Sequence, residues 1–154
     1  MKKSFQFNIM KKTDPPIVVE ANYSAATQIV WDAITQVEHM QAWFFPNIET
    51  FESKVGFETS FAVQSGDKTF THHWKITDVI PLKKIAYNWN YTEYTGDGFV
   101  VFELFEMNES TLLRLTNIIT EDYPSDILEF KRESCIGGWE YFLNQSLKEY
   151  LEKK

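Results

Sequence analysis

The sequence has a single cysteine, Cys135, among its 154 residues. One thiol cannot form an internal disulfide, which is typical of a protein in a reducing compartment. Basic residues are fewer than acidic ones: the chain has 15 Lys and Arg and 22 Asp and Glu, which gives a net charge of -7. Such a chain repels nucleic acid and anionic surfaces on average, so no nucleic-acid partner is expected.

Long hydrophobic runs are also missing. No segment approaches the roughly 18 apolar residues that a membrane-spanning helix needs, and no membrane span is expected. The stretch from Ser4 to Met10 is too short and too polar for an export signal, and no small-residue cleavage site follows it. Together these absences predict a cytoplasmic protein.

Internal repeats, low-complexity tracts and Gly/Ser linkers are absent too, and glycine and proline number only 6 and 5. A chain of this length fits one domain of ordinary size, which buries about 70% of the surface that its unfolded form exposes. We therefore expect a single domain over residues 1–154, with an N-terminal arm or strand over 1–16 and a core over 17–152.

Aromatic residues, in contrast, are plentiful. The chain has 13 Phe, 7 Tyr and 5 Trp, which make up 16% of its residues. Each such ring buries about 150–250 Å². The rings therefore either fill the core completely or border a cavity within it, and the sequence leaves both alternatives open.

Hydrophobic periodicity divides the chain into three parts. Ile17–Tyr23 is rich in β-branched residues and predicts a strand, followed by two short helices, one capped by Ser24 and one over Val37–Trp43. At the end of the chain, apolar residues at spacings of three and four predict one long helix, with Asp126 and Glu129 as its capping box. Between these parts the apolar period is two, which predicts strands over 57–64, 69–80, 84–91, 98–107 and 111–118.

Helices that are segregated from the strands are typical of an α+β fold with an antiparallel sheet. One face of such a sheet must be covered, and the terminal helix is the one predicted element long and apolar enough to cover it. A curved sheet wrapped around a helix leaves a gap, which we expect to be lined by large aromatic side chains.

Six motifs, taken in order along the chain, resemble one known family. They are VWDAIT from Val30, VEHM from Val37 with Trp43, ITDVIP from Ile76, IAYNW from Ile85, TLLRLT from Thr111 and GWE from Gly138. The set resembles the activator-of-heat-shock-ATPase homologue group of the START-like (SRPBCC, Bet v 1-like) superfamily. The resemblance covers residues 17–151, and it rests on the order of the motifs because each alone is weak.

The resemblance implies a helix-grip fold, in which a curved antiparallel sheet wraps around a long C-terminal helix and encloses a deep cavity for hydrophobic small molecules. Members of the family are functionally diverse. The chain departs from the family in two places. It has Trp43-Phe44-Phe45 where members often carry two consecutive tryptophans, and Asn117 after Thr116 where many carry a histidine. Both departures argue against transferring site chemistry from the family.

Histidines are the first candidates for polar chemistry, because imidazole serves as a base or a ligand near pH 7. His72 and His73 are adjacent on a predicted strand and point to opposite faces, so they cannot chelate one ion and no metal site is expected. One of the two is expected to face the gap. His39 is expected at the surface.

Signatures of the standard enzyme classes are not found. The chain has no Gly-rich phosphate loop and no nucleophile elbow, and Cys135 lies within a predicted helix without a catalytic signature around it. Neither a catalytic residue nor a cofactor is predicted. Cyclase-like or hydrolase-like chemistry with a buried His or Tyr as acid or base stays open as a weaker alternative.

Alternation along the strands predicts which side chains border the gap, with Trp43 and Phe44 at its mouth. Gly137 and Gly138 lower the stability of a helix, which suggests a close approach by a strand or a ligand. The predicted ligand-binding residues are Trp43, Phe44, Phe61, His73, Trp74, Tyr87, Trp89, Phe102, Asn117, Trp139 and Phe142.

Two classes of function are compatible with these observations. The first is binding of a hydrophobic small molecule, such as a lipid, a fatty acid or an aromatic metabolite, without catalysis. The second, by analogy with the co-chaperone after which the family group is named, is a protein-interaction module with a chaperone or another protein as partner.

Overall fold

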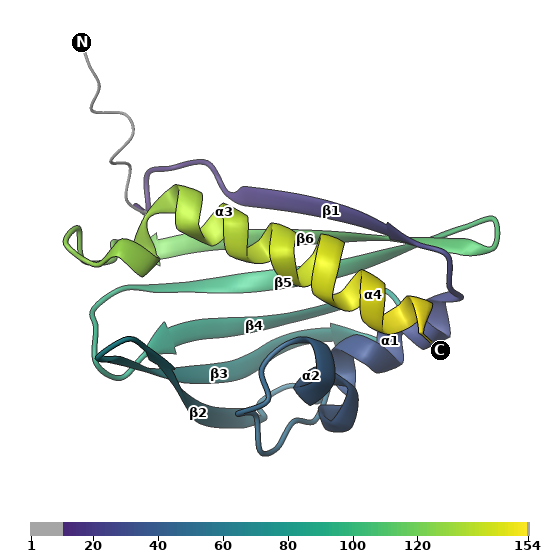
Figure 1. Cartoon of the computed structure of the whole chain (residues 1–154), viewed down its shortest axis with the longest axis horizontal. Coiled ribbons are helices and arrows are strands. Elements are labelled where there is room, and N and C mark those ends of the chain that lie inside the picture. Colours follow the sequence, from purple (N-terminus) through teal and green to yellow (C-terminus); the bar gives the residue numbers. More distant parts are fainter. Residues whose placement is uncertain (1–10, 154) are drawn as a thin grey trace, which may run out of the picture.

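The computed structural model describes residues 11–153, so residues 1–10 of the expected N-terminal arm or strand over 1–16 lie outside the described residues. Six strands form one antiparallel sheet in the order β1-β6-β5-β4-β3-β2, as Figure 1 shows. The strands are β1 (Ile17–Tyr23), β2 (Glu58–Ser65), β3 (Lys68–Ile80), β4 (Lys84–Tyr91), β5 (Asp97–Met107) and β6 (Ser110–Glu121).

The helices lie on one side of this sheet (Figure 1). Two short helices follow β1, and a long helical rod that runs without interruption over residues 132–152 ends the described chain. This arrangement confirms the α+β helix-grip fold predicted from the sequence. The helical elements are α1 (Thr27–Thr35), α2 (Val37–Trp43), the 3-10 turn η2 (Leu128–Phe130), α3 (Arg132–Tyr141), the π-helical η3 (Phe142–Ser146) and α4 (Leu147–Glu152).

Strand β1 shows how the sequence sets the two faces of the sheet. Its residues alternate strictly between buried and exposed, and Ile17, Val19, Ala21 and Tyr23 face the interior. This period of two places every second side chain on the covered face, which is typical of an antiparallel sheet with one solvated face. No helix in residues 11–153 is long and apolar enough to cross a membrane.

Two predicted helix starts are wrong. Helix α1 begins after Ala26 rather than Ser24, and no side chain caps it. The predicted capping box at Asp126 and Glu129 does not form, because Glu129 belongs to η2 and α3 begins only at Arg132. Burial of the Phe130 ring in this segment accounts for the separate turn, since the ring packs on the side chains from β3 and β4. Helix α2, in contrast, ends before Pro46 as predicted.

The long helix contains one π-helical stretch, η3, which shifts its backbone carbonyls out of the regular ladder. The hydroxyl of buried Tyr23 donates a hydrogen bond of 2.7 Å to the carbonyl of Leu143 in this stretch. The Ser146 hydroxyl donates a bond of 2.6 Å to the carbonyl of Trp43 at the end of α2. These two bonds tie the rod to β1 on one side and to the short helices on the other.

Part of the interior between sheet and rod is solidly filled by aromatic rings. Phe44 stacks on Trp43 at 4.6 Å between ring centroids and on Trp74 at 5.7 Å. Tyr87 packs on Trp74 at 4.8 Å and on Phe102 at 5.8 Å. All five side chains are buried, so in this region the aromatic surplus fills the core.

Candidate functional site

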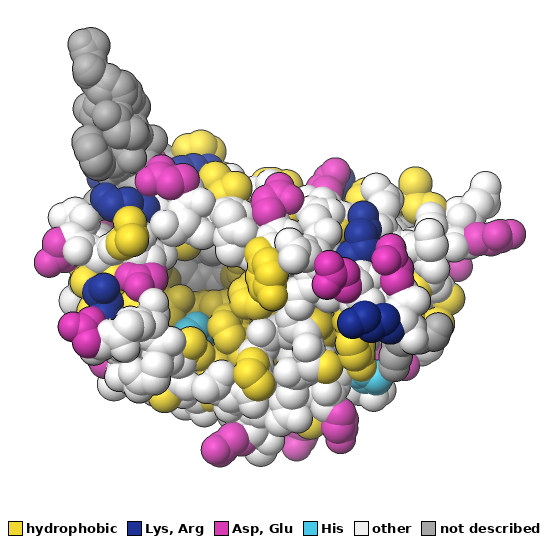
Figure 2. All heavy atoms as spheres, in the orientation of Figure 1, with side chains coloured by type: hydrophobic (Ala, Val, Ile, Leu, Met, Phe, Trp, Pro, Cys, Tyr) yellow, Lys and Arg dark blue, Asp and Glu magenta, His cyan; other side chains and the backbone are white. Residues whose placement is uncertain are grey.

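A cavity of about 290 Å³ lies between the sheet and the first turns of the C-terminal rod. Figure 2 shows the molecule hollowed on this face, with hydrophobic side chains and a histidine inside the hollow. Both alternatives for the aromatic surplus are therefore realised, each in its own part of the interior. The cavity is lined by Phe45, Val63, Phe70, His72, Trp89, Tyr91, Asn117, Ile119, Tyr123, Glu129, Cys135, Gly138, Trp139 and Phe142.

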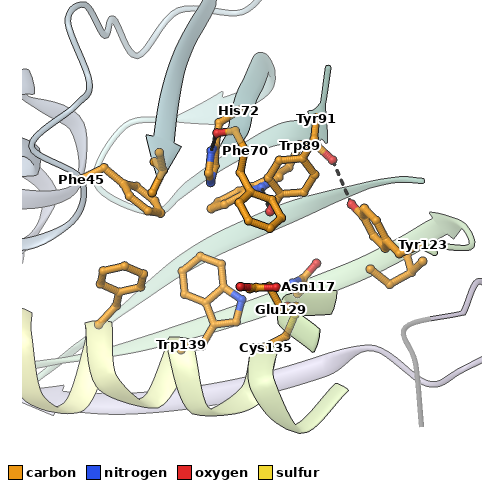
Figure 3. Close-up of a pocket in the computed structure, with 14 residues that line it drawn as sticks. Phe45, Phe70, His72, Trp89, Tyr91, Asn117, Tyr123, Glu129, Cys135 and Trp139 are labelled. Carbon is orange, nitrogen blue, oxygen red and sulfur yellow. Dashed lines mark hydrogen bonds between the residues drawn. The ribbon is translucent and has the colours of Figure 1, made fainter. Parts of the chain in front are cut away.

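Regular spacing places these side chains on one side of each element. On the sheet, the lining alternates by two residues, from Phe70 to His72 on β3 and likewise along β4 and β6. On the rod, the lining residues are Cys135, Gly138, Trp139 and Phe142, whose offsets of three, four and seven define one helical face. Figure 3 shows Trp139 facing the aromatic side chains of β3 and β4 across the cavity.

No strand approaches the glycines of α3 closely, so of the two expected alternatives, a strand or a ligand, the strand is wrong. A Cβ atom added at Gly137 or at Gly138 would meet no atom within 4 Å. Gly138 borders the cavity, whereas Gly137 is exposed. The missing side chain at Gly138 therefore leaves room in the cavity.

His72 is the buried histidine of the site, only 5% exposed. Its Nδ1 lies 3.0 Å from the carbonyl oxygen of Phe70, and its ring stacks on Phe61 at 4.7 Å. Burial lowers the pKa of His72 from 6.5 to about 4, against the opposing effects of the Phe70 carbonyl and Glu93. The imidazole is therefore neutral at pH 7.

The other buried titratable groups at the cavity are neutral as well. Burial raises the pKa of Tyr91 and of Tyr123 above the usual value of 10.0 and raises that of the Cys135 thiol to about 12. The indole of Trp89 donates a hydrogen bond of 2.8 Å to the Tyr91 hydroxyl, and the Tyr123 hydroxyl donates one of 3.3 Å to the Trp89 carbonyl. The latter bond is drawn in Figure 3.

Glu129 brings a carboxylate to this apolar lining. Its Oε2 accepts a hydrogen bond of 2.7 Å from the Ser65 hydroxyl, and its Oε1 lies 3.7 Å from Nζ of Lys68. The second distance is short enough for an ion pair but too long for a hydrogen bond. Burial opposes ionisation, but the bond from Ser65, together with the backbone and Lys68, lowers the pKa of Glu129 below 4.5. Glu129 is therefore ionised at pH 7.

Four of the predicted ligand-binding residues line the cavity, namely Trp89, Asn117, Trp139 and Phe142. Six others lie beside it, packed into the filled part of the interior or against His72. Trp43 and Phe44 are 2% and 5% exposed, so the expectation that they lie at the mouth is wrong. The six are Trp43, Phe44, Phe61, Trp74, Tyr87 and Phe102.

The choice of His73 as the inward histidine is wrong. Its Nδ1 lies 2.9 Å from the Ser60 hydroxyl and its Nε2 lies 3.1 Å from a Glu58 carboxylate oxygen, on the solvated face of the sheet. Trp74 and His73 are neighbours on β3 and cannot share a face, so the burial of Trp74 requires His72 to point inward. His39, expected at the surface, is half-buried, and its Nδ1 contacts the Tyr150 hydroxyl at 2.5 Å.

Ten lining residues were not among those predicted. Phe70 and His72 could have been found because they lie four and two residues before Trp74 on β3, on the same face of the strand. Cys135 and Gly138 could have been found because they share a face of the helix with Trp139. Glu129 gives no such signal, because a glutamate before a helix is normally an exposed capping residue. The other five are Phe45, Val63, Tyr91, Ile119 and Tyr123.

A metal centre is not indicated. No group of three or more His, Cys, Asp or Glu side chains in residues 11–153 is placed to hold an ion.

A wider groove of about 860 Å³ lies on the outside of the molecule, between the start of α1 and the turn from β3 to β4. It is not enclosed between sheet and rod, so the aromatic cavity is the better candidate for a small-molecule site.

Solved structures with the same fold come from several bacteria. A protein from Mesorhizobium loti superposes with a TM-score of 0.75 at 22% identity, covering 91% of this chain and 98% of that one. A protein from Chromobacterium violaceum gives 0.73 at 17% identity, with 89% and 96% covered. The Aha1 dimer from Colwellia psychrerythraea gives 0.69 at 19% identity, with 90% and 97% covered. Identities this low show a common fold alone.

None of the curated proteins compared with the chain matches it. The family model described as "Activator of Hsp90 ATPase homolog 1-like protein" matches residues 24–152, which is most of the chain. This match confirms the resemblance carried by the ordered motifs of the sequence. The protein therefore belongs to the Activator of Hsp90 ATPase homolog 1-like family.

Proposed function

We propose that the protein binds an apolar small molecule, such as a lipid, a fatty acid or an aromatic metabolite, in the cavity between the sheet and α3, without transforming it. The family and its fold support a ligand-binding or cyclase-like domain. The observation that carries the proposal is the unfilled volume of about 290 Å³ among aromatic side chains. A concave, mostly apolar hollow with a few polar groups at its wall is the usual form of a small-molecule site, and this hollow has that form.

The size of the cavity favours a compact ligand. Small-molecule sites commonly enclose about 300–1,000 Å³, and this cavity lies at the lower end of that range. One or two fused rings fit such a volume better than a long acyl chain. Trp89 and Trp139 contact each other edge to face, with ring centroids 5.6 Å apart, and both border the cavity, where their remaining surfaces offer aromatic contacts to such rings.

Binding is favoured over catalysis by the protonation states in the cavity. General acid–base catalysis is most effective when the pKa of the catalytic group lies near the working pH. The His72 pKa is lowered to about 4 and the Cys135 pKa is raised to about 12, both by burial. Neither group therefore exchanges a proton readily near pH 7.

Titration with 1-naphthalenemethanol, a neutral two-ring probe, tests the proposal. The tryptophan emission of the wild type should change in a saturable way, because Trp89 and Trp139 line the cavity. A Gly138→Leu variant fills the cavity and should lose this response. The matched Gly137→Leu variant places the same side chain on the exposed side of α3 and should bind as the wild type does.

Two outcomes would contradict the proposal. One is the absence of binding by neutral, basic and acidic two-ring probes alike to the folded wild type. The other is equal binding by the Gly138→Leu and Gly137→Leu variants, which would place the probe elsewhere. Cytoplasmic location stays a prediction from the sequence.

A protein-interaction role of the co-chaperone type is the second candidate, and the outer groove supports it. Exposed apolar side chains border this groove at Ile80, Leu82 and Phe105. An Ile80→Glu variant should then lose any stimulation of a purified heat-shock ATPase, whereas Val55→Glu, an exposed position outside the groove, should retain it. No stimulation by the wild type would contradict this second role.

A further inference from the structure

We propose that the cavity selects apolar ring compounds that carry a hydrogen-bond donor, above all a protonated amine, and that Glu129 makes this selection. The inference rests on the proposed function and narrows it, since it disfavours fatty acids and other carboxylates.

The carboxylate of Glu129 has one oxygen in need of a donor. Its Oε2 is satisfied by the Ser65 hydroxyl, whereas Oε1 is shielded from solvent and accepts no hydrogen bond. Nζ of Lys68 lies 3.7 Å from Oε1, and Lys68 does not line the cavity. An unsatisfied buried acceptor costs free energy, so a ligand N–H or O–H placed there is favoured.

The carboxylate lies at the rim of the cavity, where 32% of the Glu129 side chain is exposed while its Oε1 is shielded. Figure 3 shows the Glu129 side chain among the lining side chains, in the region of Asn117 and Trp139. It is brought there by η2, whose Phe130 is buried against Phe70 and Tyr91. A ligand ring between the sheet and Trp139 could therefore present its substituent to Glu129.

Glu129 gives the cavity its charge. Burial keeps the imidazole, phenol and thiol groups of the lining neutral at pH 7, as described above. Among the lining residues that the structure describes, none is a lysine or an arginine. The one charged group of this lining is thus a carboxylate, only partly offset by Lys68 outside the lining, and it attracts a cationic substituent and repels an anionic one.

His72 adds a second acceptor. A carbonyl oxygen can only accept, so the contact between His72 Nδ1 and the Phe70 carbonyl requires the hydrogen to be on Nδ1. The neutral ring then leaves Nε2 with a free lone pair. Asn117 can donate or accept, and the Tyr91 hydroxyl, which accepts from Trp89, keeps its own hydrogen to donate. Neutral hydroxyl compounds therefore fit the lining as well, although less tightly than amines.

A series with one ring system and three substituents tests this inference. The probes are 1-naphthylmethylamine, 1-naphthalenemethanol and 1-naphthoate, titrated into the wild type at pH 7 and followed by calorimetry. The amine is expected to bind about tenfold more tightly than the alcohol, because its positive charge adds Coulomb attraction to the hydrogen bond with Glu129, and the carboxylate is expected to bind most weakly.

Removal of the charge should change this order. A Glu129→Gln variant keeps an acceptor for Ser65 and should bind the amine about tenfold more weakly than the wild type, while its affinity for the alcohol stays within about twofold. The control is Glu133→Gln, which removes one negative charge from an exposed position at the start of α3. It should leave all three affinities unchanged.

The results separate this inference from the proposed function. If the naphthoate binds the wild type as tightly as the amine, the inference is overturned and cavity binding stands. If Glu133→Gln weakens the amine as much as Glu129→Gln does, the preference comes from overall charge and the inference is overturned. If none of the three probes binds, the proposed function itself fails. The comparison in the wild type holds even where a variant does not fold.

Discussion

Two buried tyrosines differ in what their hydroxyl groups contact. The Tyr23 hydroxyl donates to the Leu143 carbonyl, which lies in the π-helical stretch η3. The Tyr87 hydroxyl is fully buried and has no hydrogen-bond partner. Burial raises the pKa of both phenols, so neither is ionised in the folded protein.

The same substitution should therefore have opposite effects at these positions. Tyr23→Phe should lower the free energy of unfolding by about 1–2 kcal/mol, because it removes a satisfied buried hydrogen bond. Tyr87→Phe should raise it by up to about 1 kcal/mol, because it removes an unsatisfied group. Urea unfolding of both variants measures the difference, and a clear loss for Tyr87→Phe would mean that its hydroxyl has a partner.

His72 should make the stability of the fold depend on pH. Its pKa is 6.5 in the unfolded chain and is lowered by burial to about 4 in the folded one, so mild acid protonates the unfolded state first. The His72 contribution is fully present above pH 6.5 and is lost as the pH falls toward 4. From the two pKa values, the loss between pH 7 and pH 5 is about 2 kcal/mol.

Urea unfolding at pH 7 and pH 5 tests this dependence. A His72→Phe variant keeps an aromatic ring against Phe61 but cannot be protonated, so its stability should fall by about 2 kcal/mol less than that of the wild type over this interval. His73→Gln, on the solvated face, is the matched control and should behave as the wild type does. Equal slopes for wild type and His72→Phe would contradict the burial of a neutral imidazole.

At the level of single residues, the sequence predicts side-chain orientation only where the strand register is known. Because side chains alternate along a strand, His72 and Trp74 on β3 lie on the same face. A shift of the strand pairing by one residue would move every side chain of β3 to the other face. The register becomes definite only through pairing, where His72 lies opposite Phe61 on β2 and Tyr91 on β4. The sequence alone therefore identified Trp89 and Trp139 as lining residues but selected the wrong histidine.

Helix α3 contains two glycines that lower its stability, and one of them leaves space in the cavity. Gly137 and Gly138 are adjacent and unhindered, and only the second borders the cavity. Glycine in a helix interior costs about 0.8–1 kcal/mol relative to alanine. Gly137→Ala and Gly138→Ala should each raise the free energy of unfolding by about that amount, and thermal unfolding should show a rise of a few degrees.

The two alanine variants should differ in binding. The new methyl group at position 138 projects into the cavity and should weaken the binding of 1-naphthalenemethanol, whereas the one at position 137 should not. Destabilisation by Gly137→Ala would show instead that this part of α3 needs a conformation available only to glycine.

Elements with strong periodicity were predictable and the short connection before α3 was not. Six strands and the long terminal helix follow from apolar periods of two and of about 3.6, which depend only on the local sequence. Segment 124–131 carries a plausible capping box, but tertiary packing of Phe130 overrides it and makes η2. Since Glu129 reaches the cavity through η2, its role could not be inferred from the pattern.

For the whole molecule, the fold follows from the order of elements, whereas the cavity depends on side-chain volumes. The meander and the closing helix specify the sheet order and leave one face to be covered. Whether rings fill the space under the helix depends on how large residues such as Phe44 and Trp74 pack against small ones such as Gly138. Such packing is a three-dimensional property that alternation along one strand does not contain.

This division between a filled and a hollow part should appear in the dynamics of the molecule. Local opening begins where few buried apolar contacts hold an element. Helix α3 borders the cavity and has no side-chain cap at its first turn, whereas the interior strands β5 and β6 pair along most of their length. Amide hydrogen exchange should therefore be faster in α3 than in these strands.

Ligand binding should reduce that difference. A molecule that fills the cavity stabilises the closed state by RT ln(1 + [L]/Kd), which is about 2.7 kcal/mol at one hundred times the Kd. Saturation with 1-naphthylmethylamine should thus slow exchange in α3 by up to about a hundredfold where exchange proceeds by opening of the cavity. Slowing confined to the outer groove at Ile80–Lys84 would place the ligand there, because that turn shares no lining residue with the cavity.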